Sequence, residues 1–259
     1  MKFPTSPVLV LTLLVSAQVG YLLGVQRQWR RGRRWSFWRL LAFLGGAGMV
    51  AFAVSPPVMW HAHQDLRWHM LQHLLLGMFA PLLLVLAAPI ALLLRSLPGT
   101  AARLMARGLR SAPPRWLAHP LTALVLNVGG LYLTPLYAAT LNSPLLHGLM
   151  HWHFLAAGCL FTWVVLAGPD PAPYAARAWV RLGVLFVAMA AHATLAKLMY
   201  GFGWPRGTHH GLEEIQAAAQ LMYYGGDLAE MLVLGLLLAR WGRRRGPTGG
   251  QVALPCPSK

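Results

Sequence analysis

Two pairs of histidines share the spacing H-x-x-x-H, and each pair stands at the start of a long apolar run. The first pair is His69 and His73 in HMLQH, and the second is His147 and His151 in HGLMH. Residues four apart lie on one helical face with Cβ atoms about 5–6 Å apart, so each pair can direct two imidazoles at one ion. The positive end of a helix disfavours imidazolium and favours the neutral ring that binds metals. These four histidines are therefore predicted to form one metal site.

Other residues near the pairs are secondary candidates, and each also fits a purely structural role. His153 points to a different side of its helix, and His192 lies within a later apolar run. Met70 and Met150 supply thioethers, which together with imidazole suit copper, although methionine is also an ordinary core residue. Zinc and haem also bind histidine and remain alternatives. The remaining histidines are interpreted as polar loop or interfacial residues, namely His61, His63, His119, His209 and His210.

Two acidic residues, Asp227 and Glu230, fall within the last apolar run. A charge at membrane depth costs about 2.5–3.5 kcal/mol or more on insertion scales, so each acid should have a partner. Asp227 could accept the N–H of a ligating histidine or balance a metal charge, and a structural ion pair is equally consistent. The candidate partners are His192, Lys197, Tyr223 and Tyr224. Glu213 and Glu214 are expected to cap the N-terminus of the same helix.

These candidates must be positioned by membrane-spanning helices. The chain of 259 residues is 57% hydrophobic and 11% charged, whereas a soluble domain is about a quarter charged. Its apolar runs are long enough to cross about 30 Å of hydrocarbon as helices. The sequence predicts an all-α, seven-helix transmembrane bundle as one domain over residues 1–241, followed by a basic, disordered cytoplasmic tail over 242–259. The predicted spans are 7–25, 37–54, 67–94, 117–138, 144–167, 178–200 and 214–240.

The basic residues predict the orientation of this bundle. With the N-terminus outside, 18 of the 22 lysines and arginines fall on the cytoplasmic side, as the positive-inside rule requires. The net charge of +16 is thus a topology signal with attraction to anionic lipid, and it does not indicate nucleic-acid binding. The first run resembles a secretory signal, but the arginines that follow it favour a retained helix. Ten of the eleven histidines then share the outer side of the membrane.

The segment from Trp68 to Pro98, WHMLQHLLLGMFAPLLLVLAAPIALLLRSLP, resembles the signature region of the multi-spanning CtaG family of cytochrome c oxidase assembly factors. The run LLHGLMHWHFLAAGCLFTWVVL is similar to the second histidine block of that family, and the tyrosine-rich last span with Asp227 is similar to its last helix. The resemblance covers residues 55 to 240. It implies a seven-helix inner-membrane protein that helps to assemble haem–copper oxidase, at the step of copper delivery.

The expected function is therefore copper binding on the periplasmic side and delivery to oxidase subunits, with a periplasmic copper donor as a further partner. A haem-binding redox protein that uses the same histidines is one alternative. An ion or metal transporter with His192, Lys197 and Asp227 on its path is another. Cys159 and Cys256 fall at different depths and form no CxxC motif, which disfavours thiol chemistry. No nucleophile–base pair or phosphate loop is present in the sequence, so an enzyme is not expected.

Overall fold

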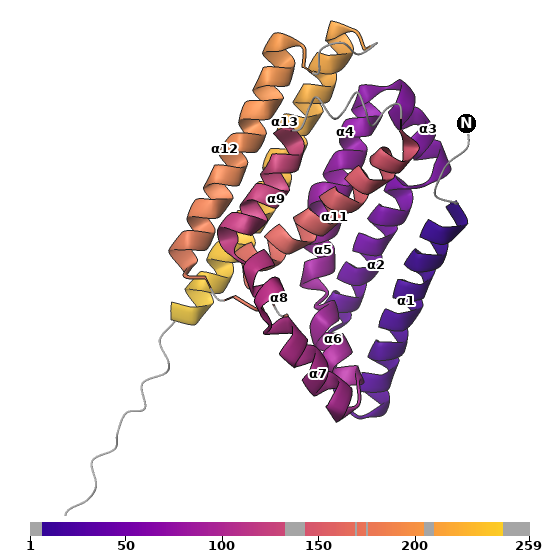
Figure 1. Ribbon diagram of the computed structural model, residues 1–259, viewed down its shortest axis with the longest axis vertical. Helices are drawn as coiled ribbons and strands as arrows, with labels where there is room; N and C mark the ends of the chain where they lie inside the picture. The colour runs from indigo at the N-terminus through magenta and orange to yellow at the C-terminus, as the bar shows by residue number, and fades with distance from the viewer. Residues whose placement is uncertain (1–6, 133–142, 169, 175, 205–209, 246–259) are drawn as a thin grey trace, which may run out of the picture.

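The computed structural model describes residues 7–132, 143–168, 170–174, 176–204 and 210–245, and these residues form helices joined by short turns without a strand (Figure 1). The helices are α1 (Pro7–Arg30), α2 (Phe37–Ala53), α3 (Pro56–Gln64), α4 (Leu66–Leu74), the π-helix η1 (Leu75–Phe79), α5 (Ala80–Leu86), α6 (Pro89–Ser96), α7 (Gly99–Leu109), α8 (Ala112–Leu117), α9 (Pro120–Tyr132), α11 (Pro144–Leu166), α12 (Ala178–Phe202) and α13 (Leu212–Arg245). The all-α prediction is confirmed for this part of the chain.

Four stretches of the described chain are long and apolar enough to cross a membrane, namely Leu66–Ser96, Leu145–Leu166, Ala178–Phe202 and Leu212–Arg243. A fifth is added if α2 and α3, which bend by 53° at their junction, form one broken span. Helix α9 is apolar but short, and residues 133–138 of its predicted span lie outside the described residues. A multi-span helical membrane protein is therefore established, and the count of seven and the orientation stay predictions.

The third predicted span is interrupted, and Pro81 is the physical reason. Proline has no amide hydrogen, and its ring collides with the carbonyl of the preceding turn in a regular α-helix. The chain widens there into the π-helix η1, in which Ala80 donates its amide N–H to the carbonyl of Leu75, five residues earlier. Such a single π-turn is the usual response to an interrupted ladder of helical hydrogen bonds.

Helix α11 packs directly against this interruption. A Cβ atom added to Gly158 would collide with the carbonyl oxygen of Gly77 in η1 and would lie 2.8 Å from the Cγ of Pro81. Only glycine permits this approach of two backbones, which is a common device where membrane helices cross. Helix α11 also contacts α9 and α5, while α12 and α13 pack side by side at one edge of the molecule and α1 lies at the other (Figure 1).

A second group of contacts joins α1, α2 and α6. Tyr21 stacks on Phe43 with ring centroids 3.8 Å apart, donates its hydroxyl to the carbonyl of Ala87 at 2.8 Å and accepts from the indole N–H of Trp35 at 3.2 Å. The N-terminus of α6 is capped by Asp170, whose carboxylate accepts the amide of Ala91 at 2.6 Å. Burial of this loop carboxyl raises the pKa of Asp170 above its usual value. The capping bond therefore ties the loop after α11 to the third span.

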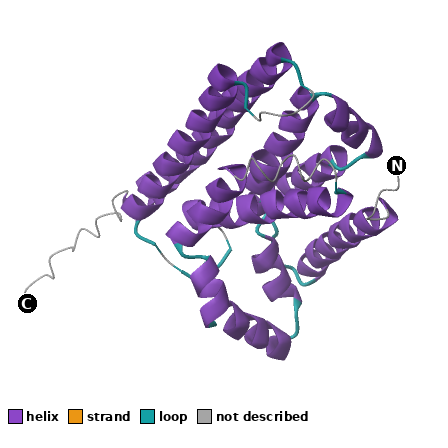
Figure 2. Cartoon of the chain, turned by 45° about the horizontal axis from the view of Figure 1, so that its top comes forward, coloured by secondary structure: helices purple, strands orange, loops and turns teal. Residues whose placement is uncertain are grey.

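Several segments predicted as loops are helices. The outer segment that carries His61 and His63 is α3, which begins with the two prolines 56 and 57, and proline is favoured in the first turn of a helix. The predicted cytoplasmic loop after the third span contains α7 and α8, which bury none of their residues within this chain. Helix α13 continues to Arg245, so the predicted boundary at residue 241 is four residues too early. The rest of the predicted tail, residues 246–259, lies outside the described residues (Figure 2).

The contact at Gly158 predicts the effect of a single methyl group. Gly158→Ala should lower the free energy of unfolding by about 1–3 kcal/mol, because backbone atoms of η1 cannot move away cheaply. Gly148→Ala, in the same helix with open space around it, should be neutral or stabilising by up to about 1 kcal/mol. Unfolding by sodium dodecyl sulfate in mixed micelles measures both. Equal stability of the two variants would contradict the close packing.

Candidate metal site of the histidine cluster

The two histidine pairs lie on facing helices, with His69 and His73 on α4 and His147 and His151 on α11. All four side chains are buried. The ring centroids of His69 and His147 are 6.0 Å apart across the two helices, and those of His147 and His151 are 4.4 Å apart along α11. The approach of α11 to η1 at Gly158 therefore brings the pairs together in the first turns of both helices.

The structure adds His63 of α3 to this group. The centroid of its ring lies 4.8 Å from that of His147, and its Nδ1 atom lies 2.6 Å from the carbonyl oxygen of Met59. Sequence reasoning placed His63 in a polar loop and missed it. The two prolines before the run, which indicate a helix start, are the signal that could have placed His63 on an ordered helix beside α4.

His73 occupies the inner end of the cluster. Its ring packs edge-on against Phe154 with centroids 4.7 Å apart, and its Cε1 atom would lie 3.5 Å from a Cβ atom at Gly77. Ring contacts join His63, His69 and His151 to His147, whereas the ring contact of His73 is with Phe154. The predicted set of four thus divides into His69, His147 and His151, which cluster with His63, and His73, which lies one helical turn further along α4.

His192 is buried on α12, and its ring lies against the backbone of α13. A Cβ atom at Gly226 would overlap the Cε1 and Nδ1 atoms of the His192 ring and would lie 3.1 Å from its Nε2 atom. Neither ring nitrogen of His192, nor of His147, has a hydrogen-bond partner in the described part of the chain. Buried polar atoms of this kind cost about 1–3 kcal/mol each when unsatisfied. Their lone pairs are available to a cation.

The rings are close but do not converge. Across the described ranges, no group of three or more His, Cys, Asp or Glu side chains is positioned, as it lies, to hold one ion. The ring planes of His147 and His151 are 80° apart, and those of His63 and His147 are 37° apart. The cluster is thus a set of neighbouring donors whose rings would have to turn to share a metal.

The secondary candidates lie around the cluster rather than within it. The Nε2 atom of His153 lies 3.0 Å from the carbonyl oxygen of Leu126 in α9, where the ring packs against Gly130. Met70 is half-buried and packs into the apolar core between α4, α12 and α13. Met150 is half-buried on α11. Sequence analysis did not weigh Gln72, whose amide donates to the carbonyl of Ala53 at 2.6 Å.

The two acids Asp227 and Glu230 lie well beyond the first turns of α13. Asp227 is half-buried and follows Gly226, against which the His192 ring packs, but it makes no hydrogen bond to His192 or His147. Lys197, a proposed partner, lies over the Tyr223 ring at 5.7 Å from its centroid instead. Glu230 is buried one turn from Asp227, and its Oε2 atom has no hydrogen-bond partner among the described residues.

Two other acids lie at the N-terminus of α4. Asp65 caps this helix by accepting the amide of Arg67 at 2.8 Å, and hydrogen bonds from the Arg67 side chain lower the pKa of this carboxyl below its usual value. Glu214 accepts the amide of Leu66 at 2.6 Å and lies 2.8 Å from Nδ1 of His210. Sequence analysis assigned Glu214 to its own helix α13, whereas its carboxylate joins α13 to α4. The charge of Asp65 is balanced by Arg67, with which it forms an ion pair at 2.7 Å.

Two more histidines have structural neighbours of their own. His61 is exposed and stacks on Trp68, with ring centroids 5.1 Å apart. His119 accepts the amide of Leu121 at 3.3 Å in the first turn of α9. His209 lies outside the described residues. The interpretation of His61 and His119 as residues outside the metal cluster agrees with these contacts.

Fold and cluster together define a multi-span helical membrane protein that carries buried histidines between two of its helices. The chain matches the family described as cytochrome c oxidase caa3 assembly factor, Caa3_CtaG, over residues 19–244, and it belongs to that family. It is 36% identical over 185 residues to uncharacterized proteins of Mycobacterium bovis and Mycobacterium tuberculosis, and 34% identical over 190 residues to one of Mycobacterium leprae. These matches cover 68% of this chain and 28% of each relative, so the chain spans little more than a quarter of their length. No solved structure is significantly similar to it.

The contact between His192 and Gly226 predicts that a methyl group added at residue 226 destabilises the protein. Gly226→Ala should displace the His192 ring and lower the midpoint of thermal unfolding in detergent, because an overpacked core loses about 1–3 kcal/mol. Gly235→Ala on the same helix, where nothing lies within 4 Å, should not lower it. An unchanged midpoint in Gly226→Ala would show that this ring does not pack on α13.

Proposed function

We propose that this protein assists the assembly of cytochrome c oxidase by receiving copper in the histidine cluster and passing it to an oxidase subunit. The family supports the assembly role. The copper role is supported by the chemistry of the cluster, in which the donors are imidazoles without a carboxylate in contact, a set that suits copper and zinc better than magnesium or calcium. The proposed donors are His63, His69, His147 and His151, with His73 and His192 as inner positions.

The separation of the rings carries this proposal. A ring nitrogen binds zinc or copper at about 2.0–2.1 Å, and the ring centroid lies about 1.2 Å further out, so two rings on one tetrahedral ion have centroids about 5 Å apart. The three separations around His147 are 4.4, 4.8 and 6.0 Å, close to this value. Only rotations of the rings about their side-chain bonds are then needed, and the χ2 torsion of histidine is broad.

The surroundings place one carboxylate near this position. Glu214 bonds to the amide of Leu66 at the start of α4, whereas the charge of Asp65 is balanced by Arg67. On the predicted topology this end of the bundle faces the periplasm, where a copper donor would meet it.

The packing favours a single ion over haem. Haem with two axial histidines needs space for the flat porphyrin between their rings. The His147 ring instead has the His63 and His151 rings beside it, with centroids 4.8 and 4.4 Å away. The inner histidines then give the ion a second stage, since His73 lies one helical turn beyond His69 on α4 and His192 is buried on α12. The ion then passes to an oxidase subunit when ligands of that subunit replace the imidazoles at the surface between their helices. Imidazole donors release the ion without a change of its oxidation state.

Substitution of the central ring tests the proposal. His147→Ala should lower the affinity for copper by at least about ten-fold, because second-shell losses alone cost 10–100-fold at metal sites. Copper and zinc retained by the detergent-purified full chain after loading and dialysis are measured by elemental mass spectrometry. A Soret band in the same preparation would indicate haem and would contradict the copper assignment.

His153→Ala is the matched control, because this histidine lies on the same helix but points to Leu126 in α9. It should bind as much copper as the wild type. Equal losses in His147→Ala and His153→Ala, or a loss in neither, would refute the proposed cluster. Selective retention of zinc would support the proposed binding site but would assign it to zinc instead of copper.

A further inference from the structure

The opposite end of the bundle holds a second candidate site. A pocket of about 710 Å³ lies between the turn that joins α1 to α2, the start of α2 and the end of α6. Its lining includes four arginines and two tryptophans, namely Trp29, Arg33, Arg34, Trp35, Arg39 and Arg95. The C-terminal ends of α1 and α6 lie at the end of the molecule away from α3 and the start of α4, so this pocket is remote from the histidine cluster (Figure 1).

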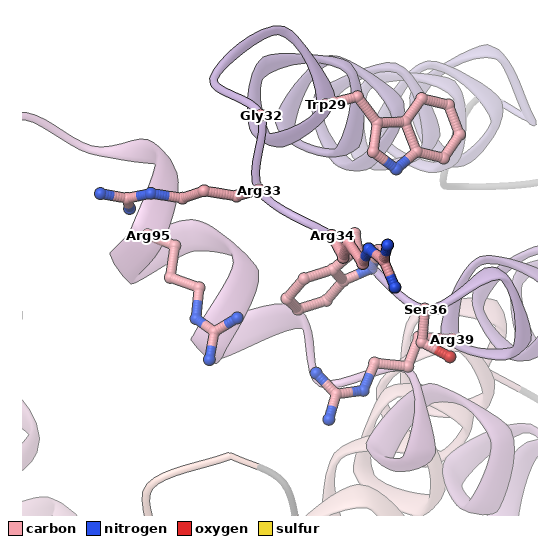
Figure 3. A pocket seen from close by; sticks show the side chains of 8 residues that line it. Trp29, Gly32, Arg33, Arg34, Ser36, Arg39 and Arg95 are labelled. Carbon is pink, nitrogen blue, oxygen red and sulfur yellow. The ribbon is translucent and has the colours of Figure 1, made fainter.

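The backbone of the α1–α2 turn sets the positions of two of these arginines. Gly32 adopts the left-handed conformation with φ of 67°, and the amide of Arg33 donates to the carbonyl of Gln28 at 3.0 Å. This is the bonding of a glycine-terminated helix, which reverses the chain directly after α1. Arg33 and Arg34 therefore follow the turn at once. In Figure 3 the side chains of Arg33, Arg39 and Arg95 enter from three different segments and surround one space.

Trp35 holds the remaining two arginines close to each other. Its indole is buried and fixed by a hydrogen bond to Tyr21, and the Cζ atoms of Arg39 and Arg95 lie 4.9 and 5.7 Å from its ring centroid. None of the residues that line the pocket is acidic. The nearby acid that interacts with Arg39 is Asp170, and its carboxylate is already bonded to the N-terminus of α6. The guanidinium groups therefore repel one another until an anion enters.

The apolar surroundings identify the source of that anion. Trp29, Phe37 and Trp38 flank the pocket and are 52%, 60% and 78% exposed. Tryptophan at a helix end is typical of the level at which lipid headgroups meet acyl chains. Arginine is the preferred partner of phosphate oxygens because its planar group offers paired N–H donors. We propose that this pocket binds the phosphate headgroup of an anionic phospholipid.

Lipid binding by the full chain in detergent tests the site. Native mass spectrometry measures the retention of phosphatidylglycerol, with phosphatidylcholine as the zwitterionic probe of the same chain length. The wild type should prefer phosphatidylglycerol, and Arg39→Gln/Arg95→Gln should lower its affinity for this lipid by about ten-fold or more, since each basic group near a membrane surface contributes a few-fold. Millimolar inorganic phosphate should not displace the lipid.

Two further variants separate the pocket from charge in general and from loss of fold. Arg103→Gln/Arg107→Gln removes the same charge from exposed positions of α7 and should change the affinity by less than about two-fold. Arg39→Lys/Arg95→Lys keeps the charge but removes the paired N–H donors, so its affinity should lie between those of the wild type and the glutamine variant. Equal binding of both lipids, displacement by inorganic phosphate, an equal loss in the α7 variant, or a loss in the lysine variant as large as in the glutamine variant would overturn the proposal.

Discussion

The contact of Gly158 with Gly77 and Pro81 is the constraint on which the histidine cluster depends. Pro81 forces a wide turn into the third span, and the wide turn presents a carbonyl oxygen to α11. A residue without a side chain at position 158 lets α11 come to rest on that turn. Because both helices are stiff, the crossing fixes the distance between their outer ends. Four imidazoles on two helices thereby become one buried group.

The chain has six acidic residues, and five of them have an identifiable role or neighbour in the described structure. Asp65 and Glu214 serve the N-terminus of α4, and Asp170 serves the N-terminus of α6. Each places negative charge where helix dipoles are positive, which is favourable by about 0.3–1 kcal/mol at exposed sites. Asp227 interacts electrostatically with buried Glu230. With so few acids, most arginines cannot pair with a carboxylate. They interact instead with backbone carbonyl oxygens, with aromatic rings and, as proposed above, with lipid headgroups.

Sequence patterns predicted the helices well because apolar runs and H-x-x-x-H spacing are local properties. The facing of His69 and His147 was an inference from two similar motifs, and the two rings do lie 6.0 Å apart across α4 and α11. His63 was missed, since nothing local in HAH indicates that a short helix folds back onto α4. Asp170 and Glu214 act across the molecule, on α6 and α4, and no spacing in the chain reveals such partners. The same holds for the ring of His192 on Gly226, which depends on how α12 and α13 are packed.

The inner end of α11 is held by two arginines from different helices. Arg181 of α12 donates to the carbonyl of Val165 at 3.2 Å, and Arg240 of α13 donates to that of Leu166 at the same distance. The His151 and His147 positions lie on the other side of Gly158 from these bonds. At 1.5 Å per residue the distance from Gly158 to His147 along α11 is roughly 16 Å, so a difference of about 5° in the crossing angle would move that imidazole by about 1.4 Å and the His151 ring by about 0.9 Å. The separations between the rings therefore depend closely on the angle at which α11 crosses η1.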